Sequence, residues 1–305
     1  MRIGDTLIED TFAEAFRMRF ARVLATAADD HWVDIAAREL AGYATSIIGC
    51  DAEAGIERRL APEETPDGRP GVAVLLFGFS TEALAKAVPN RVGQCILTCA
   101  TTAAFDGLRE SEERIPLGRH LRFFGDGFQK SKLIGGRRYW RIPVMDGEFV
   151  VEQSVGVGKG VAGGNIILQA VDGPAALAAA RRAVDAVAPM PGVITPFPGG
   201  VVRSGSKVGS RYKKLRATTN DAYCPTLRGR TESRLHPEAN AAYEIVIDGV
   251  DEPSVAAAMA AAIRAAAGPG VPHIGAGNYG GKLGKFHFRL HEVLQTFSGT
   301  QNGAR

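Results

Sequence analysis

The first third of the chain alternates between apolar runs and segments with helical spacing. Trp32, Ile35 and Leu40 recur at helical spacing, between an acidic cap at Asp29 and a stop at Gly42. A second helix opens at Ser80. Continuous apolar runs predict strands at 19–27, 45–50, 72–77 and 94–98. The predicted order of elements is therefore βαββαβ.

A similar succession returns in the last half of the chain. Asp172-Gly173-Pro174 opens an alanine-rich helix to about Val187, and Asp251-Glu252-Pro253 opens another that ends at Gly268. Extended segments are predicted at 165–170, 193–204, 243–247 and 271–276. This order is again βαββαβ.

The repeated order predicts an α+β fold of two ferredoxin-like (split βαβ) lobes that arose by duplication. Residues from about 105 to 160 interrupt the two patterns and are typical of a hairpin-rich insertion. We place the N-terminal lobe with its insertion at residues 1–150 and the C-terminal lobe at 151–305. The last residues, Leu294–Arg305, resemble an added tail.

Composition narrows the class of protein. The 305 residues are 45% hydrophobic and 23% charged, with a formal net charge of +3, so the chain is an ordinary globular protein without a bias toward nucleic acid. The basic run 211–216 suits a solvated loop or a contact with an anion. The chain contains no uninterrupted apolar run of about 18 residues, so the sequence predicts no membrane span. Four cysteines in apolar contexts are typical of a reduced, cytoplasmic protein.

The stretch 274–285, IGAGNYGGKLGK, contains the pattern G-x-G-x-x-G. In a dinucleotide-binding loop this pattern follows a strand and enters a helix. Here residues 285–291 alternate between apolar and polar positions, which predicts a strand instead. The glycines therefore form a turn, or they let the backbone approach a ligand.

The sequence gives little support for a metal site or for a nucleophilic catalytic residue. On a strand, His287 and His291 would lie about 13 Å apart and could not share an ion. Cys95 and Cys99 fail for the same reason. Cys224 has no evident histidine partner, so a buried cysteine is favoured over a nucleophile.

Polar turns rich in glycine stand out instead, at 125–127, 163–165, 198–200, 219–221 and 275–281. Several follow predicted strands, where binding groups are commonly mounted. Glu244 lies on the predicted strand Tyr243–Ile247, on the face opposite Ile245 and Ile247. A carboxyl group beside an apolar neighbour can have a raised pKa and act as an acid or base, although a solvated glutamate is the commoner case.

Motifs along nearly the whole chain resemble those of one family, the formylmethanofuran:tetrahydromethanopterin N-formyltransferases. The stretches that carry the resemblance are 9–16, 52–56, 62–71, 123–127, 160–165, 196–200, 206–210, 219–226 and 274–285. The resemblance implies transfer of a formyl group between a methanofuran-type amine carrier and tetrahydromethanopterin. It implies a homotetramer, no metal, and no permanently bound cofactor.

The same resemblance assigns roles to residues. A carboxylate in a Y-E-I-V-I strand serves the family near the pterin nitrogen, which here makes Glu244 the expected catalytic residue and proton shuttle. The expected substrate-binding positions are Phe124, Gly125, Asp126, Gly163, Gly164, Asn165, Pro198, Gly199, Gly200, Lys207, Asn220, Asp221, Tyr223 and Asn278.

The basic, alanine-rich composition resembles that of bacterial family members that oxidise formaldehyde. That setting implies association with subunits of a formyl-carrier hydrolase. Two alternatives stay open. One is a non-catalytic scaffold subunit with the family fold. The other, a tetrahydrofolate-dependent formyltransferase, is weaker because we find no Asn-His-Asp constellation in the chain.

Overall fold

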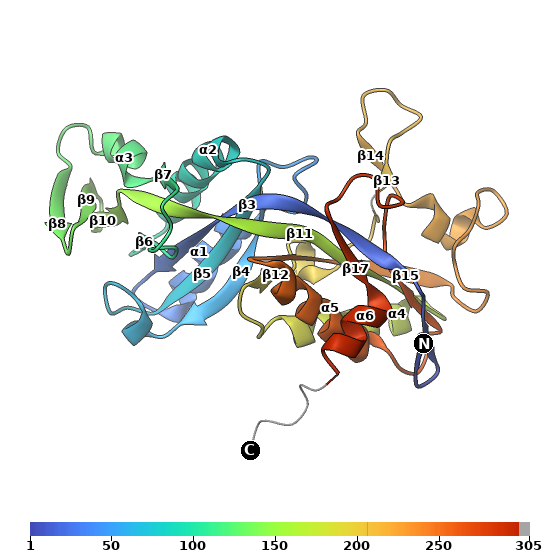
Figure 1. Ribbon diagram of the computed structural model, residues 1–305. Coiled ribbons are helices and arrows are strands. Elements are labelled where there is room, and N and C mark those ends of the chain that lie inside the picture. Colours follow the sequence, from blue (N-terminus) through green and yellow to red (C-terminus); the bar gives the residue numbers. More distant parts are fainter. Residues whose placement is uncertain (206, 299–305) are drawn as a thin grey trace, which may run out of the picture. The chain divides into compact units, whose positions relative to one another are not determined.

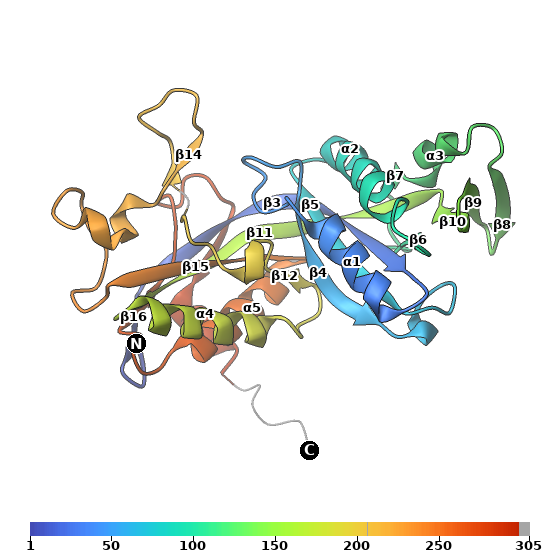
Figure 2. The same ribbon diagram turned by 180° about the vertical axis from the view of Figure 1, so that it is seen from behind.

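The computed structural model describes residues 1–205 and 207–298, which form two compact units. The N-terminal unit comprises Met18–Gly160, and the C-terminal unit comprises Met1–Arg17 with Val161–Arg305. Two long strands, β3 (Phe12–Thr26) and β11 (Ser154–Ala170), contribute residues to both units. Figures 1 and 2 show them in blue and in yellow-green. The first 17 residues thus pack with the second half of the chain.

In the N-terminal unit, four antiparallel strands lie in the order β6-β3-β5-β4. Helices α1 (Asp30–Ala41) and α2 (Thr81–Arg91) pack on this sheet. The side chains of Asp29 and Ser80 accept hydrogen bonds from backbone N–H groups of the first turns, as the sequence predicts. The other strands are β4 (Glu53–Leu60), β5 (Gly71–Gly78) and β6 (Ala103–Asp106).

Two strands predicted here are wrong. Residues 45–50 form turns, and the second strand begins at Glu53. Residues 94–98 prolong α2 as a π-helical turn, η2 (Val92–Ile96), and the fourth strand is β6. Val92 and Ile96 are fully buried on one side of this turn. A short apolar run fits a buried helical turn as well as a strand, and only the tertiary packing decides between them.

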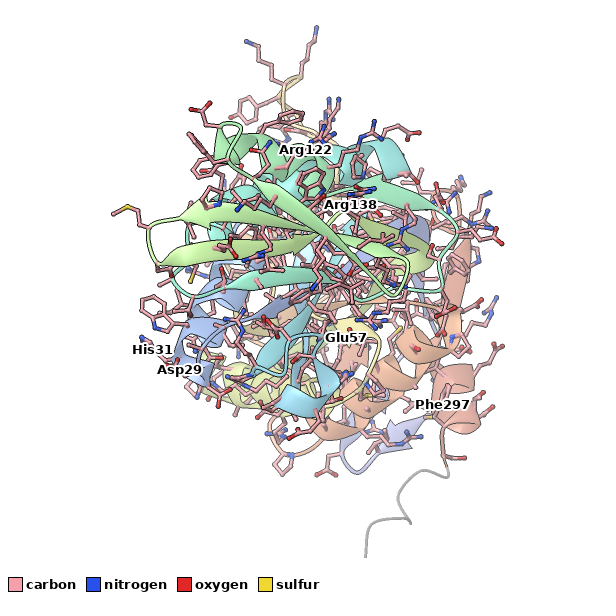
Figure 3. The ribbon with its side chains drawn as sticks, turned by 90° about the vertical axis from the view of Figure 1, so that its left-hand side faces the viewer. Asp29, His31, Glu57, Arg122, Arg138 and Phe297 are labelled. Carbon is pink, nitrogen blue, oxygen red and sulfur yellow. The ribbon has the colours of Figure 1, made fainter. Side chains whose placement is uncertain are left out.

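The predicted hairpins are present before residue 160. Strands β8 (Lys130–Ile134), β9 (Arg137–Val144) and β10 (Gly147–Glu152) form an antiparallel meander, and β10 runs parallel to β6. Arg122, labelled in Figure 3, belongs to the turn that precedes this meander. Its guanidinium group lies over the ring of Trp140 in β9, 4.7 Å from the ring centroid. Short elements precede the meander, namely β7 (Arg114–Pro116), α3 (Gly118–Leu121) and η3 (Arg122–Gly125).

In the C-terminal unit, four antiparallel strands lie in the order β16-β11-β15-β12. Helices α4 (Gly173–Val187) and α5 (Glu252–Ala266) pack against each other and against β15. Alanines along both helices allow this close packing, since most of those facing the sheet are fully buried. The strands are β12 (Val193–Ile194), β15 (Ala241–Gly249) and β16 (His273–Gly275).

The N-terminal segment completes this unit. Strands β1 (Arg2–Ile3) and β2 (Thr6–Ile8) form a hairpin, and β2 pairs in parallel with β16. Strand β17 (Phe286–Arg289) pairs with residues 12–15 of β3. The extended segment predicted at 193–204 is interrupted after Ile194, because Pro198–Gly200 form a 3-10 turn, η4, and the chain is extended again at Val201 and Val202.

The end of the chain also differs from prediction. The strand predicted at 285–291 stops at Arg289, and helix α6 (Leu290–Thr296) follows. Leu294, the expected start of a tail, is 4% exposed in the core. Residues 299–305 of that expected tail, and Ser206, lie outside the described residues. Within the described part, no helix is long and apolar enough to cross a membrane.

Candidate active site

Glu244 lies on β15, a central strand of the C-terminal unit. Its neighbours Ile245 and Ile247 are fully buried in the core beneath α4 and α5. Because side chains alternate along a strand, Glu244 points to the face away from these helices. Opposite it, Val202 makes two backbone hydrogen bonds with Glu244, of 2.8 and 3.1 Å. The predicted face of this strand is therefore confirmed.

A small cavity of about 40 Å³ adjoins the Glu244 side chain. Its walls are Ile167, Val202, Arg203, Ser204, Gly205, Asn220, Tyr223, Cys224, Ala242 and Tyr243. Among the described residues, no group donates a hydrogen bond to the Glu244 carboxylate, and burial raises its pKa to about 7. At neutral pH this carboxyl group can therefore both release and accept a proton.

Two tyrosines are electrostatically coupled to Glu244. Tyr223 lines the same cavity, and Tyr279 lies in the glycine-rich stretch after β16. Burial raises the pKa of both hydroxyls, and the negative charge of Glu244 raises it further. Both hydroxyls consequently stay neutral at physiological pH, where they can donate hydrogen bonds toward developing negative charge.

The glycine-rich stretch wraps around a carboxylate of the protein itself. Glu14 of β3 is 1% exposed and accepts four backbone hydrogen bonds. The donors are the N–H groups of Tyr279, Gly281, Leu283 and Gly284, at 2.7, 2.9, 2.5 and 2.5 Å. Burial alone would raise the pKa of Glu14, but together the four donors lower it.

The glycines allow this wrapping for steric reasons. Gly280 and Gly281 have φ angles of 70° and 74°, which favour glycine. A Cβ atom at Gly284 would lie 2.5 Å from the Ala15 carbonyl oxygen. Of the two roles that the sequence leaves open for these glycines, the structure shows the turn.

Two predicted substrate-binding amides also hold this stretch in place. Asn165 accepts a hydrogen bond from Gly277 N–H at 2.6 Å, and its Nδ2 donates to the carbonyl oxygens of Gly277 and Gly163, both at 3.1 Å. Asn278 Nδ2 donates to the carbonyl oxygen of Phe12 at 3.1 Å. The two amides thus position the backbone that carries Tyr279. Their contact with substrate stays a prediction.

The other predicted glycines have packing roles. A Cβ atom at Gly164 would lie 2.3 Å from Val255 of α5, so glycine allows the helix to approach the sheet. Gly163, at φ 95°, lies at an irregularity of β11. Pro198 opens the turn η4, in which Gly199 and Gly200 have φ angles of 62° and 75°.

The remaining predicted positions fall into two groups. Lys207 lies on β13 (Lys207–Val208) and pairs with Asp221 at 2.5 Å, which lowers the Asp221 pKa, and Asn220 lines the Glu244 cavity. Phe124, Gly125 and Asp126 belong to the N-terminal unit instead. Phe124 is 67% exposed, and Asp126 adopts a left-handed conformation at φ 49°.

Sequence reasoning missed a polar cluster next to this site. Gln169 of β11 is 1% exposed, lies 3.1 Å from His273 Nδ1, and accepts a hydrogen bond from His236 N–H at 2.6 Å. Burial raises the pKa of Glu9, and the positive charge of Arg234 opposes that rise. The signal was Gln169 itself, a polar residue directly after the apolar run Ile166–Leu168.

Within the described residues, no group of three His, Cys, Asp or Glu side chains could hold a metal ion. The prediction that His291 lies on a strand is wrong. His291 lies in α6, with its Nε2 2.9 Å from the Ile8 carbonyl oxygen. Cys95 and Cys99 are half-buried, and burial raises the pKa of both thiols. Neither thiol has the lowered pKa of a reactive cysteine.

Comparison with known proteins gives concordant results. The family model of formylmethanofuran-tetrahydromethanopterin formyltransferase matches residues 1–144, and the model of the proximal lobe of the same enzyme matches residues 147–293. The formylmethanofuran–tetrahydromethanopterin formyltransferase of Methylobacillus flagellatus is 56% identical over 301 residues, which cover 96% of this chain and 100% of the relative.

Solved structures agree with these matches. The formylmethanofuran:tetrahydromethanopterin formyltransferase of Methanosarcina barkeri superimposes with a TM-score of 0.91 at 51% identity, covering 96% of this chain and 100% of the other. A chain of the formyltransferase/hydrolase complex of Methylorubrum extorquens, solved with methylofuran, has a TM-score of 0.91 at 50% identity. That match covers 95% of this chain and 98% of the other.

The two-lobed fold and these matches define an enzyme that transfers formyl groups. The chain belongs to the formylmethanofuran–tetrahydromethanopterin formyltransferase family.

Proposed function

We propose that this chain moves a formyl group between formyl-tetrahydromethanopterin and a methanofuran-type amine, with Glu244 as the proton shuttle. The observation that carries this proposal is the raised pKa of Glu244, about 7, beside a cavity that Tyr223 also lines. The negative charge of Glu244 acts on the hydroxyls of Tyr223 and Tyr279, both of which are neutral. A general acid–base group is most effective when its pKa lies near the working pH. The two carriers are substrates, and no permanently bound cofactor enters the proposal.

The proposed reaction is an acyl transfer between two nitrogens. The carrier amine attacks the formyl carbon, a C–N bond forms, and the carbonyl π electrons move to oxygen. Glu244 accepts the proton that the attacking nitrogen loses. It then delivers that proton to the pterin nitrogen as the second C–N bond breaks and the carbonyl group re-forms. The carboxyl group ends the cycle in the state in which it began.

Two further effects support this reaction. Holding both carriers in contact lowers the entropic cost of a bimolecular step, by up to about 7–11 kcal/mol in well-oriented systems. The neutral hydroxyls of Tyr223 and Tyr279 can donate hydrogen bonds toward the oxyanion that forms at the formyl group. Burial at the cavity strengthens the hydrogen bonds to the oxyanion, because less water screens them.

The test is formyl transfer by the purified chain, assayed with formyl-tetrahydromethanopterin and a methanofuran-type amine. We expect turnover by the unmodified chain, and a loss of about 10²–10⁴-fold in kcat for Glu244→Gln. The matched control is Glu238→Gln, because Glu238 is exposed and does not line the Glu244 cavity. Near-normal turnover in Glu244→Gln would remove this residue from the mechanism.

The same assay addresses a purely structural role. An unmodified chain that shows no turnover alone, but does so once hydrolase subunits are added, would mean that partners complete the site. No turnover under either condition, with binding to those subunits retained, would favour a non-catalytic scaffold. Activity with formyl-tetrahydrofolate alone would instead point to a folate enzyme.

We also propose that the chain forms a homotetramer and associates with hydrolase subunits. The likeness to a chain of the Methylorubrum extorquens formyltransferase/hydrolase complex supports the second part. Sedimentation equilibrium of the purified chain tests the first part, with four times the chain mass as the expected result. Co-purification with the hydrolase subunits tests the second. A cytoplasmic location stays a prediction.

We infer that the two lobes are ferredoxin-like and arose by duplication. Each sheet numbers its strands 4-1-3-2 in order of appearance, with two helices inserted at corresponding points, and this supports a shared ancestral unit. The boundary between residues 150 and 151 stays a prediction.

A further inference from the structure

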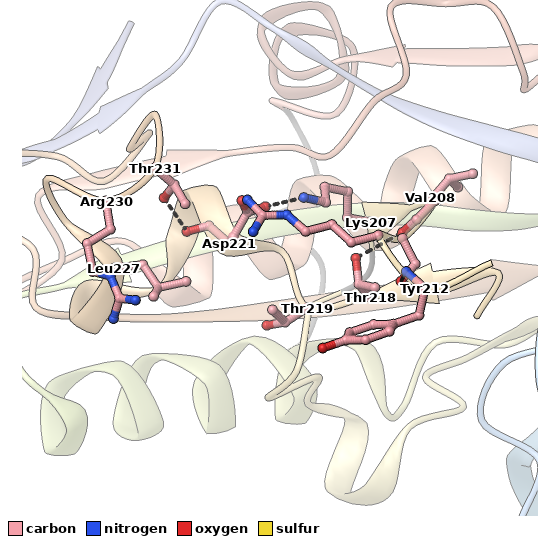
Figure 4. A pocket seen from close by; sticks show the side chains of 12 residues that line it. Lys207, Val208, Tyr212, Thr218, Thr219, Asp221, Leu227, Arg230 and Thr231 are labelled. Carbon is pink, nitrogen blue, oxygen red and sulfur yellow. Dashed lines mark hydrogen bonds and ion pairs between the residues drawn. The ribbon is translucent and has the colours of Figure 1, made fainter. Parts of the chain in front are cut away.

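A second and larger cavity, of about 570 Å³, lies in the C-terminal unit (Figure 4). The hairpin of β13 and β14 (Ala217–Thr218) and the turn η6 (Pro225–Leu227) form it. Its lining residues come from 207–212, 218–221 and 227–231. The segment includes the basic run for which the sequence left a solvated loop or an anion contact open.

This cavity carries an excess of positive charge. Its charged lining residues are Lys207, Arg211 and Arg230 against a single carboxylate, Asp221. Lys207 is paired with Asp221, and the charge of Arg211 adds to the lowering of the Asp221 pKa. In the described part of the chain, neither arginine forms an ion pair with a carboxylate. Two guanidinium charges thus remain uncompensated.

Hydroxyl groups accompany these charges. The hydroxyls of Ser210 and Tyr212 line the cavity, and no described group accepts a hydrogen bond from either. Thr218, Thr219 and Thr231 also line it, but their hydroxyls already donate to backbone carbonyl oxygens. Arginine guanidinium groups and hydroxyls are the donors that proteins use to bind phosphate and carboxylate groups. The chemistry of the lining therefore suits an anionic group of a ligand.

The cavity connects to the proposed active site through shared walls. A third cavity, of about 310 Å³, shares Lys207 and Asp221 with the cavity of about 570 Å³. It also shares Asn220 and Tyr223 with the cavity beside Glu244. Three neighbouring cavities with shared lining residues thus lie between the Glu244 carboxyl group and the two arginines. Such a series suits an elongated ligand that reacts at one end and carries an acid at the other.

We propose that Arg211 and Arg230 bind the anionic end, phosphate or carboxylate, of a carrier substrate whose reactive nitrogen lies beside Glu244. This inference rests on the proposed formyl transfer and adds a recognition subsite remote from the reacting atoms. Because the anionic end does not change during the reaction, the two arginines bind substrate and transition state equally. They therefore lower KM and leave kcat nearly unaffected.

The experiment uses Arg211→Gln, Arg230→Gln and the double variant in the full-length chain. The control is Arg216→Gln, which removes the same charge from the same loop but does not line the cavity. We expect a rise in KM of about two- to fivefold for each single variant and about tenfold for the double variant. The control should stay unchanged. Inorganic phosphate should inhibit the unmodified enzyme competitively and inhibit the double variant less.

The carrier that supplies the anion is identified by which KM rises. A rise for the pterin substrate assigns the anionic end to the pterin. A rise for the full furan carrier, without one for furfurylamine as a tail-less acceptor, assigns it to the furan carrier. Active enzyme whose KM values and phosphate inhibition are the same in the double variant would overturn the inference. Absence of transfer by the unmodified chain, both alone and with hydrolase subunits added, would instead overturn the proposed function.

Discussion

Glu14 and Glu244 are two carboxylates of the same unit, each on a strand, with opposite surroundings. Glu14 accepts four backbone hydrogen bonds and has a lowered pKa, whereas among the described residues no donor reaches Glu244, whose pKa burial raises to about 7. Burial alone would raise the pKa of both groups, so the hydrogen-bond donors account for the lowered pKa of Glu14. The first carboxylate stays charged and fixes a loop, and the second is free to exchange a proton.

The two groups are connected through that loop. By ordering Tyr279–Gly284, Glu14 fixes the stretch that carries Tyr279, whose pKa responds to the charge of Glu244. Glu14 therefore positions Tyr279, which is a neighbour of Glu244. The structural carboxylate and the proposed catalytic one thus differ in the number of their hydrogen-bond donors.

The same substitution at both positions gives the largest expected contrast. Glu14→Gln replaces one acceptor oxygen by an NH₂ group facing backbone donors, and we expect a loss of about 3–5 kcal/mol in the free energy of unfolding. Glu244→Gln should change it by less than about 1 kcal/mol at acidic pH, where the native carboxyl group is already neutral. Urea unfolding of both variants measures this. Equal losses would break the comparison.

The pH dependence of stability should separate the groups next. Between pH 4.5, the usual pKa of a glutamate, and about 7, the native state holds the Glu244 proton more tightly than the unfolded state does. The free energy of unfolding therefore falls as pH rises through this window, by about 1–3 kcal/mol from this group. The stability difference between wild type and Glu244→Gln, followed by urea unfolding from pH 4 to 8, should show this fall. A difference that is constant with pH would contradict it.

The smallest expected effect concerns Tyr279, the neighbour of both carboxylates. Tyr279→Phe keeps the ring, whose centroid lies 6.4 Å from that of Phe16, and removes the hydroxyl. Losing one hydrogen bond to the developing charge should lower kcat by about two- to tenfold. Steady-state kinetics compare it with Tyr43→Phe, since Tyr43 is 79% exposed in the other unit. An equal effect in both variants would exclude a specific role for Tyr279.

The sequence predicts much of the local structure. Capped helices such as α1 and α4 follow from Asp29 and Asp172, because caps and spacing are local signals. The strand with Glu244 follows from its alternation with Ile245 and Ile247. Short apolar runs such as 94–98 are ambiguous, because a buried helical turn and a buried strand need the same residues.

The partner of the glycine-rich stretch could not be predicted. Gly284 and Glu14 are 270 positions apart, and no local pattern connects a buried strand glutamate with a distant loop. The glycines of the G-x-G-x-x-G pattern itself do not donate to Glu14, because Gly277 and Gly280 donate to Asn165 and Asn278, and three of the four donors lie after the pattern. For the same reason the histidine neighbours of Gln169 emerge only from the fold.

The central claim is that Glu244 exchanges a proton near neutral pH. The most direct measurement is the titration of its carboxyl group by ¹³C NMR with labelled glutamate, assigned by the loss of one signal in Glu244→Gln. We predict a midpoint of about 7, matching an inflection in the pH dependence of kcat/KM. A midpoint near 4.5, with no inflection near 7 in the rate profile, would contradict the account.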